Sequence, residues 1–181
     1  MGWFSPVKGS YPSLAQVDKT LPVKEGVKAI ERGTIVALTA DDTGKSKDGV
    51  WNVGNGTDTL FYVALQDYTD PTAGFAGSAF NPAGGVPAIT ALDLAQDGEF
   101  ETSVFKTDET FNVGDPLYVN AGVLTKTNPG SGKVVGYVTR GAVERWVNNA
   151  VAVKNPDGSN DPRLAVRTGA NLTVLRFKTA V

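Results

Sequence analysis

The chain of 181 residues contains no cysteine and no histidine. Without cysteine it has no disulfide framework, no thiol nucleophile and no thiolate metal ligand. Without histidine it lacks the commonest general base and the commonest transition-metal ligand. We therefore expect no enzymatic activity, no catalytic residue, no metal site and no cofactor.

The sequence also has little charge imbalance and no long apolar run. Its 17 basic and 19 acidic residues give a formal net charge of −2, which offers no electrostatic reason to expect a nucleic-acid partner. No apolar run is long enough to span a membrane, and residues 1–12 lack the apolar core of a signal peptide. We expect neither a membrane partner nor export by a signal peptide.

Glycine and proline are plentiful, with 21 and 10 residues, and they separate many short β-rich runs. Only residues 12–20 and 142–148 offer any helix, and the latter is read as a helical turn or an edge strand. This pattern predicts an all-β fold, a small β-barrel or β-sandwich with Gly/Pro-rich turns. The expected strands are Thr34–Thr39, Val50–Val53, Leu60–Gln66, Ala88–Leu94, Glu99–Lys106, Pro116–Val119, Gly122–Lys126, Lys133–Arg140, Ala150–Lys154, Leu164–Arg167 and Leu172–Lys178.

The stretch 111–141 is the most informative part of the chain. It predicts three consecutive strands, with turns at Asn120–Gly122 and at 128–132, where Gly and Asn supply the positive φ angles that hairpins need. We interpret it as a compact β-meander. Because it carries no group suited to catalysis, it points toward assembly. Elsewhere, Gly169–Asn171 predicts a turn, and partial alternation in Glu99–Lys106 predicts an outer strand with one wet face.

Residues 1–30 differ from the β-domain expected at residues 31–181. Three prolines argue against a long helix, so we expect an extended N-terminal arm. Its aromatic and aliphatic side chains are too many for a solvated tail, and the arm therefore packs either on its own domain or on a neighbouring subunit. The candidate partner-binding residues here are Trp3, Phe4, Tyr11, Leu14 and Leu21.

Residues 67–87 show no strand pattern, and loops of this length are usually functional or mobile. Phe75 and Phe80 lie in this loop among small residues. The loop either plugs one end of a barrel or contacts a partner, and both phenylalanines are candidate partner-binding residues.

Two motifs fail as ligand sites. The Pro129–Lys133 segment resembles a phosphate-binding loop, but Thr127 and Val134 stand where that motif needs Gly and Ser or Thr, so we interpret it as a hairpin turn. The Asp157–Asp161 segment resembles a calcium loop, but its twelfth position is Thr168 rather than Glu, and we interpret it as a polar turn.

The order Val-Gly-Asp-Pro-Leu-Tyr-Val, turn, Gly-Val-Leu-Thr, turn, Val-Val-Gly-Tyr-Val spans Val113–Val138. It resembles the small β-domain of tailed-bacteriophage head decoration, or cement, proteins. Glu31–Leu38 is similar to the opening strand that such proteins often carry. The resemblance implies a virion protein without catalytic activity that binds the outer surface of an assembled capsid and stabilises it.

The partners implied are the major capsid protein and other copies of the chain, in a homotrimer rather than a homodimer. The implied location is the outer capsid surface, after assembly in the host cytoplasm. Two alternatives stay open. One is a carbohydrate-binding or carbohydrate-cleaving β-sandwich, because 19 acidic residues leave room for a carboxylate pair and a Trp could stack on a sugar. The other is a phage tail-tube or baseplate subunit.

Overall fold

The structure is a computed structural model of the chain. It describes residues 2, 4–7, 18–44, 46–65, 67–69, 88–95, 97–130, 132–154 and 160–180, and for 146–154 and 160–171 it describes the backbone alone. Every regular element in this part of the chain is a strand. The strands are β1 (Phe4–Pro6), β2 (Asp18–Pro22), β3 (Ala29–Ile30), β4 (Ile35–Thr39), β5 (Val50–Val53), β6 (Phe61–Ala64), β7 (Tyr68–Thr69), β8 (Ala88–Asp93), β9 (Glu99–Thr102), β10 (Pro116–Asn120), β11 (Val123–Thr125), β12 (Gly136–Lys154) and β13 (Asn160–Thr179). The prediction of an all-β fold is confirmed.

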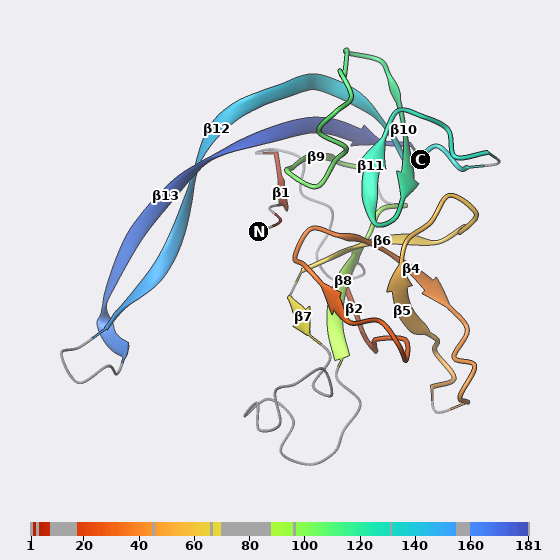
Figure 1. Ribbon diagram of the computed structural model, residues 1–181, viewed down its shortest axis with the longest axis horizontal. Helices are drawn as coiled ribbons and strands as arrows, with labels where there is room; N and C mark the ends of the chain where they lie inside the picture. Colours follow the sequence, from red (N-terminus) through yellow and green to blue (C-terminus); the bar gives the residue numbers. More distant parts are fainter. Residues whose placement is uncertain are drawn as a thin grey trace.

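The strands form three antiparallel sheets (Figure 1). The six-stranded sheet has the order β1-β9-β13-β12-β10-β11, and the five-stranded sheet has the order β2-β8-β6-β4-β5. β3 and β7 form a separate pair. In Figure 1 the six-stranded sheet lies above the five-stranded sheet, and β12 and β13 sweep away from both as one long curved ribbon.

The five-stranded sheet curls until its two edge strands approach each other. Val23, just after β2, forms a single parallel bridge with Trp51 of β5. The sheet therefore stops short of a closed barrel, and that alternative of the sequence prediction is wrong. Trp51 fills the inside of the curl, where it is fully buried, donates its indole N–H to the Ile89 carbonyl at 3.0 Å and packs on Tyr62.

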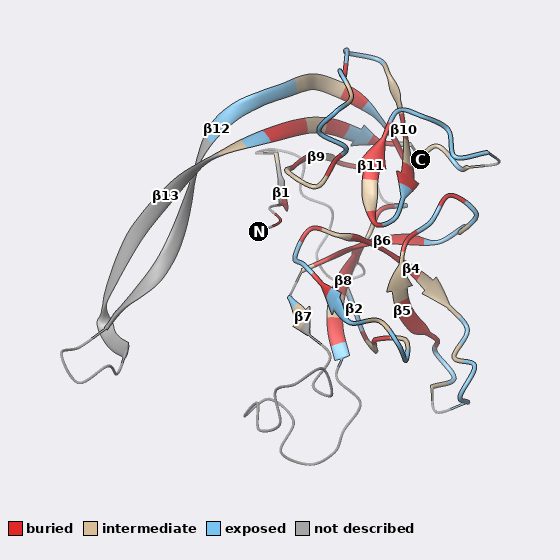
Figure 2. Cartoon of the chain, in the orientation of Figure 1, coloured by how far each residue is buried: buried red, intermediate tan, exposed pale blue. Residues whose placement is uncertain are grey.

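The main core lies between the two large sheets. Alternate residues of β4 and β6, including Ile35 and Val63, point toward the six-stranded sheet and pack with Phe100, Leu117 and Phe177. Figure 2 shows the buried residues concentrated where the two sheets meet. The intervening residues of β4 and β6 enter the curl instead, which is why all four residues of β6 are buried. That strand was expected to be buried on much of both faces, and it is.

The described part of the first thirty residues belongs to the sheets. β1 pairs with β9, and β2 pairs with β8, so regular structure begins well before Thr34, where the sequence placed the first strand. Both strands lie at sheet edges and contain a proline, Pro6 or Pro22, which an edge tolerates because one side of the strand needs no ladder hydrogen bond. Prolines that argued against a helix were therefore compatible with strands.

The predicted meander is wrong in one respect. β10 and β11 form the expected hairpin, but β12 pairs with β10 rather than with β11, through Pro116 opposite Tyr137 and Leu117 opposite Gly136. The free edge of β11 is covered by an earlier segment, since Leu124 donates its N–H to the Val104 carbonyl and accepts one from Lys106. Turn residues specify the local connection, but they do not decide which strand becomes the next neighbour.

The β10–β11 turn joins the two sheets. Ile35 donates its N–H to the Gly122 carbonyl at 2.8 Å, Gly122 donates to Gly54 at 2.8 Å, and Gly54 donates back to Ile35 at 2.9 Å. A Cβ on Gly122 would lie 2.7 Å from Thr34 Cγ2, and a Cβ on Gly54 would lie 2.9 Å from the Ile35 carbonyl oxygen. Glycine at both positions lets the two sheets approach through their backbones.

The two central residues of this turn should respond to substitution in opposite directions. Gly122 has φ +77° and no room for a Cβ, so we expect Gly122→Ala to cost about 2–3 kcal/mol. Ala121 has φ +48°, which Asn tolerates better, so Ala121→Asn should stabilise the fold by about 0.5–1 kcal/mol. Urea unfolding midpoints measure both effects. Equal midpoints for Gly122→Ala and the natural chain would show that the junction is not tight.

Candidate functional site

The most conspicuous feature of this fold is a long two-stranded ribbon. β12 and β13 pair from Gly136 opposite Thr179 to Lys154 opposite Asn160. A third strand joins them only at the base, where β9 flanks β13 and β10 flanks β12. Beyond that base the described backbone is a ribbon with both edges unpaired, and Figure 1 shows it projecting from the body.

The ribbon bends where it leaves the body. Its register shifts between Val138 and Arg140 and again between Arg140 and Val143. Such bulges bend a strand and increase its twist. Gly141 lies within this irregular segment, and a Cβ there would come 2.7 Å from the Phe111 carbonyl oxygen. The sequence prediction of a break after Arg140 therefore marked a bulge, not the end of the strand.

Several strand ends that the sequence predicted fall inside the ribbon, where the strands are continuous. Residues 142–148 are strand and not a helical turn. Gly169, Ala170 and Asn171 were expected to form a turn, but they pair in order with Asn148, Val147 and Trp146. Residues that usually favour turns are held in a continuous strand here because each has a partner across the ribbon.

A buried carboxylate fixes the base of the ribbon. Glu101 of β9 is only 3% exposed, and three arginines reach it, two of them from β12 and one from β13. Arg140 Nη2 lies 2.6 Å and Arg176 Nη2 lies 2.7 Å from Glu101 Oε1, and Arg145 Nη1 bonds Oε2. The arginine side chains stay partly solvated, between 27% and 49% exposed.

Sequence reasoning missed this cluster. Glu99–Lys106 was expected to be an outer strand, but β9 lies between β1 and β13. Glu101 looked like a solvated residue because its partners are 39, 44 and 75 residues away. Only the spacing of Glu99 and Glu101, which predicted a shared face, pointed in the right direction. Glu99 accepts a hydrogen bond from the Thr139 hydroxyl, which also belongs to β12.

Neutralising Glu101 should loosen the base of the ribbon. In Glu101→Gln the three guanidinium groups lose their shared carboxylate, and we expect a loss of about 1–3 kcal/mol, reduced from a fully buried pair because the arginines can turn toward water. Thermal unfolding would measure it. Glu144→Gln makes the same charge change at an exposed position of β12 and should change stability by less than about 0.5 kcal/mol. Equal effects of the two variants would contradict a structural role for Glu101.

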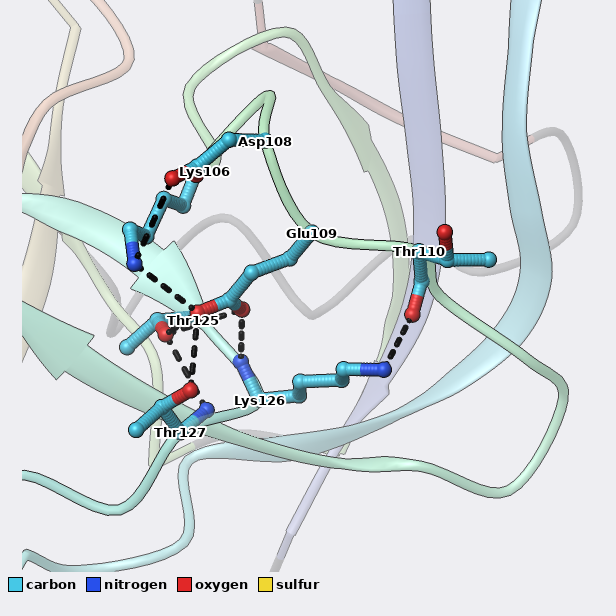
Figure 3. Close-up of polar contacts among 7 residues, drawn as sticks. All are labelled: Lys106, Asp108, Glu109, Thr110, Thr125, Lys126 and Thr127. Atoms are coloured by element: carbon cyan, nitrogen blue, oxygen red, sulfur yellow. Dashed lines mark hydrogen bonds and ion pairs between the residues drawn. The ribbon is translucent and has the colours of Figure 1, made fainter.

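A second polar cluster holds the loop between β9 and β10 (Figure 3). Glu109 accepts hydrogen bonds from the Thr125 hydroxyl at 2.7 Å, the Thr127 hydroxyl at 2.9 Å and the Lys126 backbone N–H at 2.7 Å. Lys106 Nζ lies 3.3 Å from the same carboxylate. These contacts hold the loop between β9 and β10 against the end of β11, and so they stabilise that end of the β10–β11 hairpin.

The hydrogen bonds keep Glu109 charged. Burial alone would raise its pKa, but the donors from Thr125, Lys126, Thr127 and Lys106 together lower the pKa to about 2. Each of these contacts is stronger with the carboxylate than with the neutral acid, which links the stability of the loop to pH.

This linkage should appear on acidification. Because the folded-state pKa of Glu109 lies below its ordinary value of 4.5, its stabilising contribution is present above about pH 4.5 and is lost as the pH falls toward 2. Glu109→Gln should therefore have a lower melting temperature at neutral pH and a weaker dependence on pH in that window. Glu144→Gln, which removes an exposed carboxylate outside this cluster, serves as the control. Parallel pH profiles for the natural chain and Glu109→Gln would refute this assignment.

The structure places two of the predicted partner-binding residues inside the chain's own packing. Phe4 is buried in the main core and stacks on Phe100 with ring centroids 5.0 Å apart. Leu21 is buried inside the curled five-stranded sheet. Both side chains are thus used within the chain. The remaining candidates lie outside the described residues: Trp3, Tyr11, Leu14, Phe75 and Phe80.

The Pro129–Lys133 segment, considered above as a phosphate-binding loop, is a turn. Asn128 Oδ1 accepts the N–H groups of Gly130 and Gly132, so the segment is a turn held by a side chain; it is not the expected hairpin turn, because β11 and β12 on either side of it do not pair. The Asp41 carboxylate likewise accepts the N–H groups of Thr43 and Ser46, so it bonds its own loop. The Asp157–Asp161 turn lies largely outside the described residues.

Among the residues that the structure describes, no group of three or more acidic side chains is arranged to hold a metal ion. The same residues include no helix long and apolar enough to cross a membrane. Comparison of the chain with protein families, with curated proteins and with solved structures found no match.

Proposed function

We propose that this chain is a structural virion protein that binds the outer surface of an assembled tailed-phage capsid and stabilises the shell. The observation that carries this proposal is the ribbon of β12 and β13, which extends from a packed body and is fixed at its base by three arginines on Glu101. A protein that cements a shell needs contact area beyond its own footprint, and a projecting ribbon supplies it.

The segments that carry the family resemblance meet in space, which supports treating them as one module. Glu31–Leu38 contains all of β4 except its last residue, and Val113–Val138 contains the β10–β11 hairpin. Ile35 and Gly122 join them through a direct backbone hydrogen bond. A resemblance in two segments far apart in sequence gains weight when those segments form one junction.

The polar clusters support a structural and non-enzymatic role. Glu101 uses its carboxylate to hold strands, and Glu109 uses its carboxylate to hold a loop. Each is engaged by several donors, so neither is presented to a substrate.

The partners in this proposal are the major capsid protein and other copies of the chain. Shells offer repeated threefold and twofold positions, where closed symmetry lets one patch serve every copy, and of the two we propose a homotrimer rather than a homodimer. Many weak contacts repeated over a lattice then add to a large avidity. The protein would join the outer capsid surface after assembly in the host cytoplasm.

The ribbon also favours one alternative, a tail-tube or baseplate subunit, because strands that reach a neighbour suit a ring as well as a shell. No comparable observation favours the carbohydrate-binding alternative. Trp51 is fully buried and its indole N–H is used within the chain, so it offers no platform for a sugar. Electron microscopy of the virion separates capsid surface from tail.

Binding to capsids tests the proposal directly. Purified protein should co-sediment with assembled capsids that lack it and raise their melting temperature, and it should not be retained by polysaccharide resins. A variant in which Trp146–Asn171 is replaced by Asn-Gly should bind capsids much more weakly. Arg145 and Leu172 pair directly, so a two-residue turn can connect them and leave the base intact. Retention on polysaccharide together with no binding to capsids would overturn the proposal.

A further inference from the structure

The turn between β5 and β6 contains Asn55 followed by Gly56, and this is the one place in the 181-residue sequence where glycine follows asparagine. A backbone nitrogen can attack the side-chain amide of the asparagine that precedes it. Glycine hinders this attack least, because it has no side chain and its backbone bends freely. Asn55 is exposed and Gly56 is buried. This pair is therefore a candidate site for modification by the chain's own backbone.

The reaction needs water as its only co-reactant. The Gly56 nitrogen forms a bond to Asn55 Cγ and gives up its proton, the bond from Cγ to Nδ2 breaks, and ammonia leaves. The product is a succinimide ring, which water opens at either of its two carbonyl carbons. One opening gives aspartate at position 55. The other gives a β-aspartyl linkage, in which the backbone runs through the former side chain and is one carbon atom longer.

The folded chain restrains both reacting groups. Asn55 donates its backbone N–H to Asp58 Oδ2 at 2.7 Å, and its carbonyl accepts the Asp58 N–H at 3.0 Å. The side-chain Oδ1 of Asn55 accepts the Ala121 N–H at 3.4 Å, which directs the amide toward the β10–β11 turn. A Cβ on Gly56 would come 2.2 Å from Pro129 Cγ. Rotation of the peptide group between Asn55 and Gly56 into the ring geometry would therefore break these hydrogen bonds and press Gly56 against Pro129.

These restraints are continuous with the sheet junction, by which we mean the three backbone hydrogen bonds among Ile35, Gly54 and Gly122. Gly54 precedes Asn55 in the chain, and Gly122 follows Ala121. Turning the backbone at Asn55 displaces Gly54, whose N–H bonds Ile35 and whose carbonyl accepts the Gly122 N–H. The state that can react is therefore one in which the junction is locally open.

The β-aspartyl product does not fit the closed junction. It inserts one carbon atom into the backbone between Gly54 and Gly56, and both glycines are tightly packed. A Cβ on Gly54 would lie 2.9 Å from the Ile35 carbonyl oxygen, and Gly56 lies against Pro129. Aspartate at position 55 keeps the backbone length but places a second carboxylate beside that of Asp58. The longer backbone is therefore the more damaging of the two outcomes.

We propose that Asn55 is a self-modification site at which opening of the sheet junction is converted into a permanent change of the backbone. The closed junction suppresses the reaction, and the β-aspartyl product keeps the junction from closing again. The process requires neither a capsid nor a second copy of the chain. It is therefore independent of the proposed function, and the tests of the two do not depend on each other.

Reaction rates in the folded and the unfolded chain test the first half of the proposal. The full chain is held at mildly alkaline pH with and without guanidinium chloride, and peptide mass spectrometry measures the aspartyl and β-aspartyl forms of residue 55. We expect modification to be at least about tenfold slower without denaturant, because only the open fraction reacts. Asn52, which precedes the β-branched Val53, is the internal control and should stay unmodified in both conditions. Equal rates at Asn55 in the two conditions would overturn the proposal.

Two variants separate opening of the junction from unfolding of the whole chain. Gly122→Ala strains the junction, whereas Ile89→Val weakens the packing inside the curled five-stranded sheet. At denaturant concentrations that give both variants the same unfolded fraction, we expect Asn55 to react at least about tenfold faster in Gly122→Ala. Equal rates would assign the reaction to global unfolding and contradict the proposal. Pro129→Ala, at an exposed turn position, removes the ring that packs on Gly56 and provides the same comparison if Gly122→Ala does not fold.

The isolated product tests the second half of the proposal. Chain modified in guanidinium chloride is separated by ion exchange, since modification adds one negative charge, and its β-aspartyl form is returned to native conditions. We expect this form to melt several degrees below unmodified chain taken through the same steps. Asn55→Gln forms the corresponding larger ring far more slowly and should melt at the same temperature before and after the treatment. A β-aspartyl chain that melts together with the unmodified chain would show that the junction tolerates the longer backbone, and the proposal would then be wrong.

Discussion

Three backbone hydrogen bonds among Ile35, Gly54 and Gly122 are the constraint on which the rest of the structure depends. They join the β10–β11 hairpin to the β4–β5 side of the five-stranded sheet, and at Gly54 and Gly122 a Cβ would not fit. Backbone contact of this kind sets the distance between the sheets more narrowly than side-chain packing alone, because no rotamer change can relax it. The main core then fills the space that this junction defines.

A short series of contacts connects the junction of Ile35, Gly54 and Gly122 to the ribbon of β12 and β13 and sets the ribbon's direction. β10 fixes the start of β12, β9 fixes the end of β13, and Glu101 draws arginines from both strands together. Bulges around Gly141 then turn the paired strands away from the body. The ribbon is therefore held firmly at its base, which is the arrangement that a reaching element requires.

The sequence predicted what is local in this fold and missed what is distant. Val50–Val53 and the β10–β11 hairpin were found because alternation and turn residues act over a few positions. The partner of β10, the strand character of Gly169–Asn171 and the burial of Glu101 depend on residues far along the chain, and no local signal reveals them. For the same reason, Phe4 was assigned to a partner although it stacks on Phe100, which is 96 residues away.

The strand order has a consequence for how the protein is made. All the strands of the five-stranded sheet precede residue 94, so this half can form while the ribosome is still adding residues. The six-stranded sheet forms later, because β13, the last of the described strands in chain order, lies in its interior between β9 and β12. Until β13 is made, the main core around Ile35 and Phe61 lacks Leu175 and Phe177. A nascent chain therefore keeps an incomplete main core until β13 has been added, and the apolar residues left exposed in that interval favour aggregation.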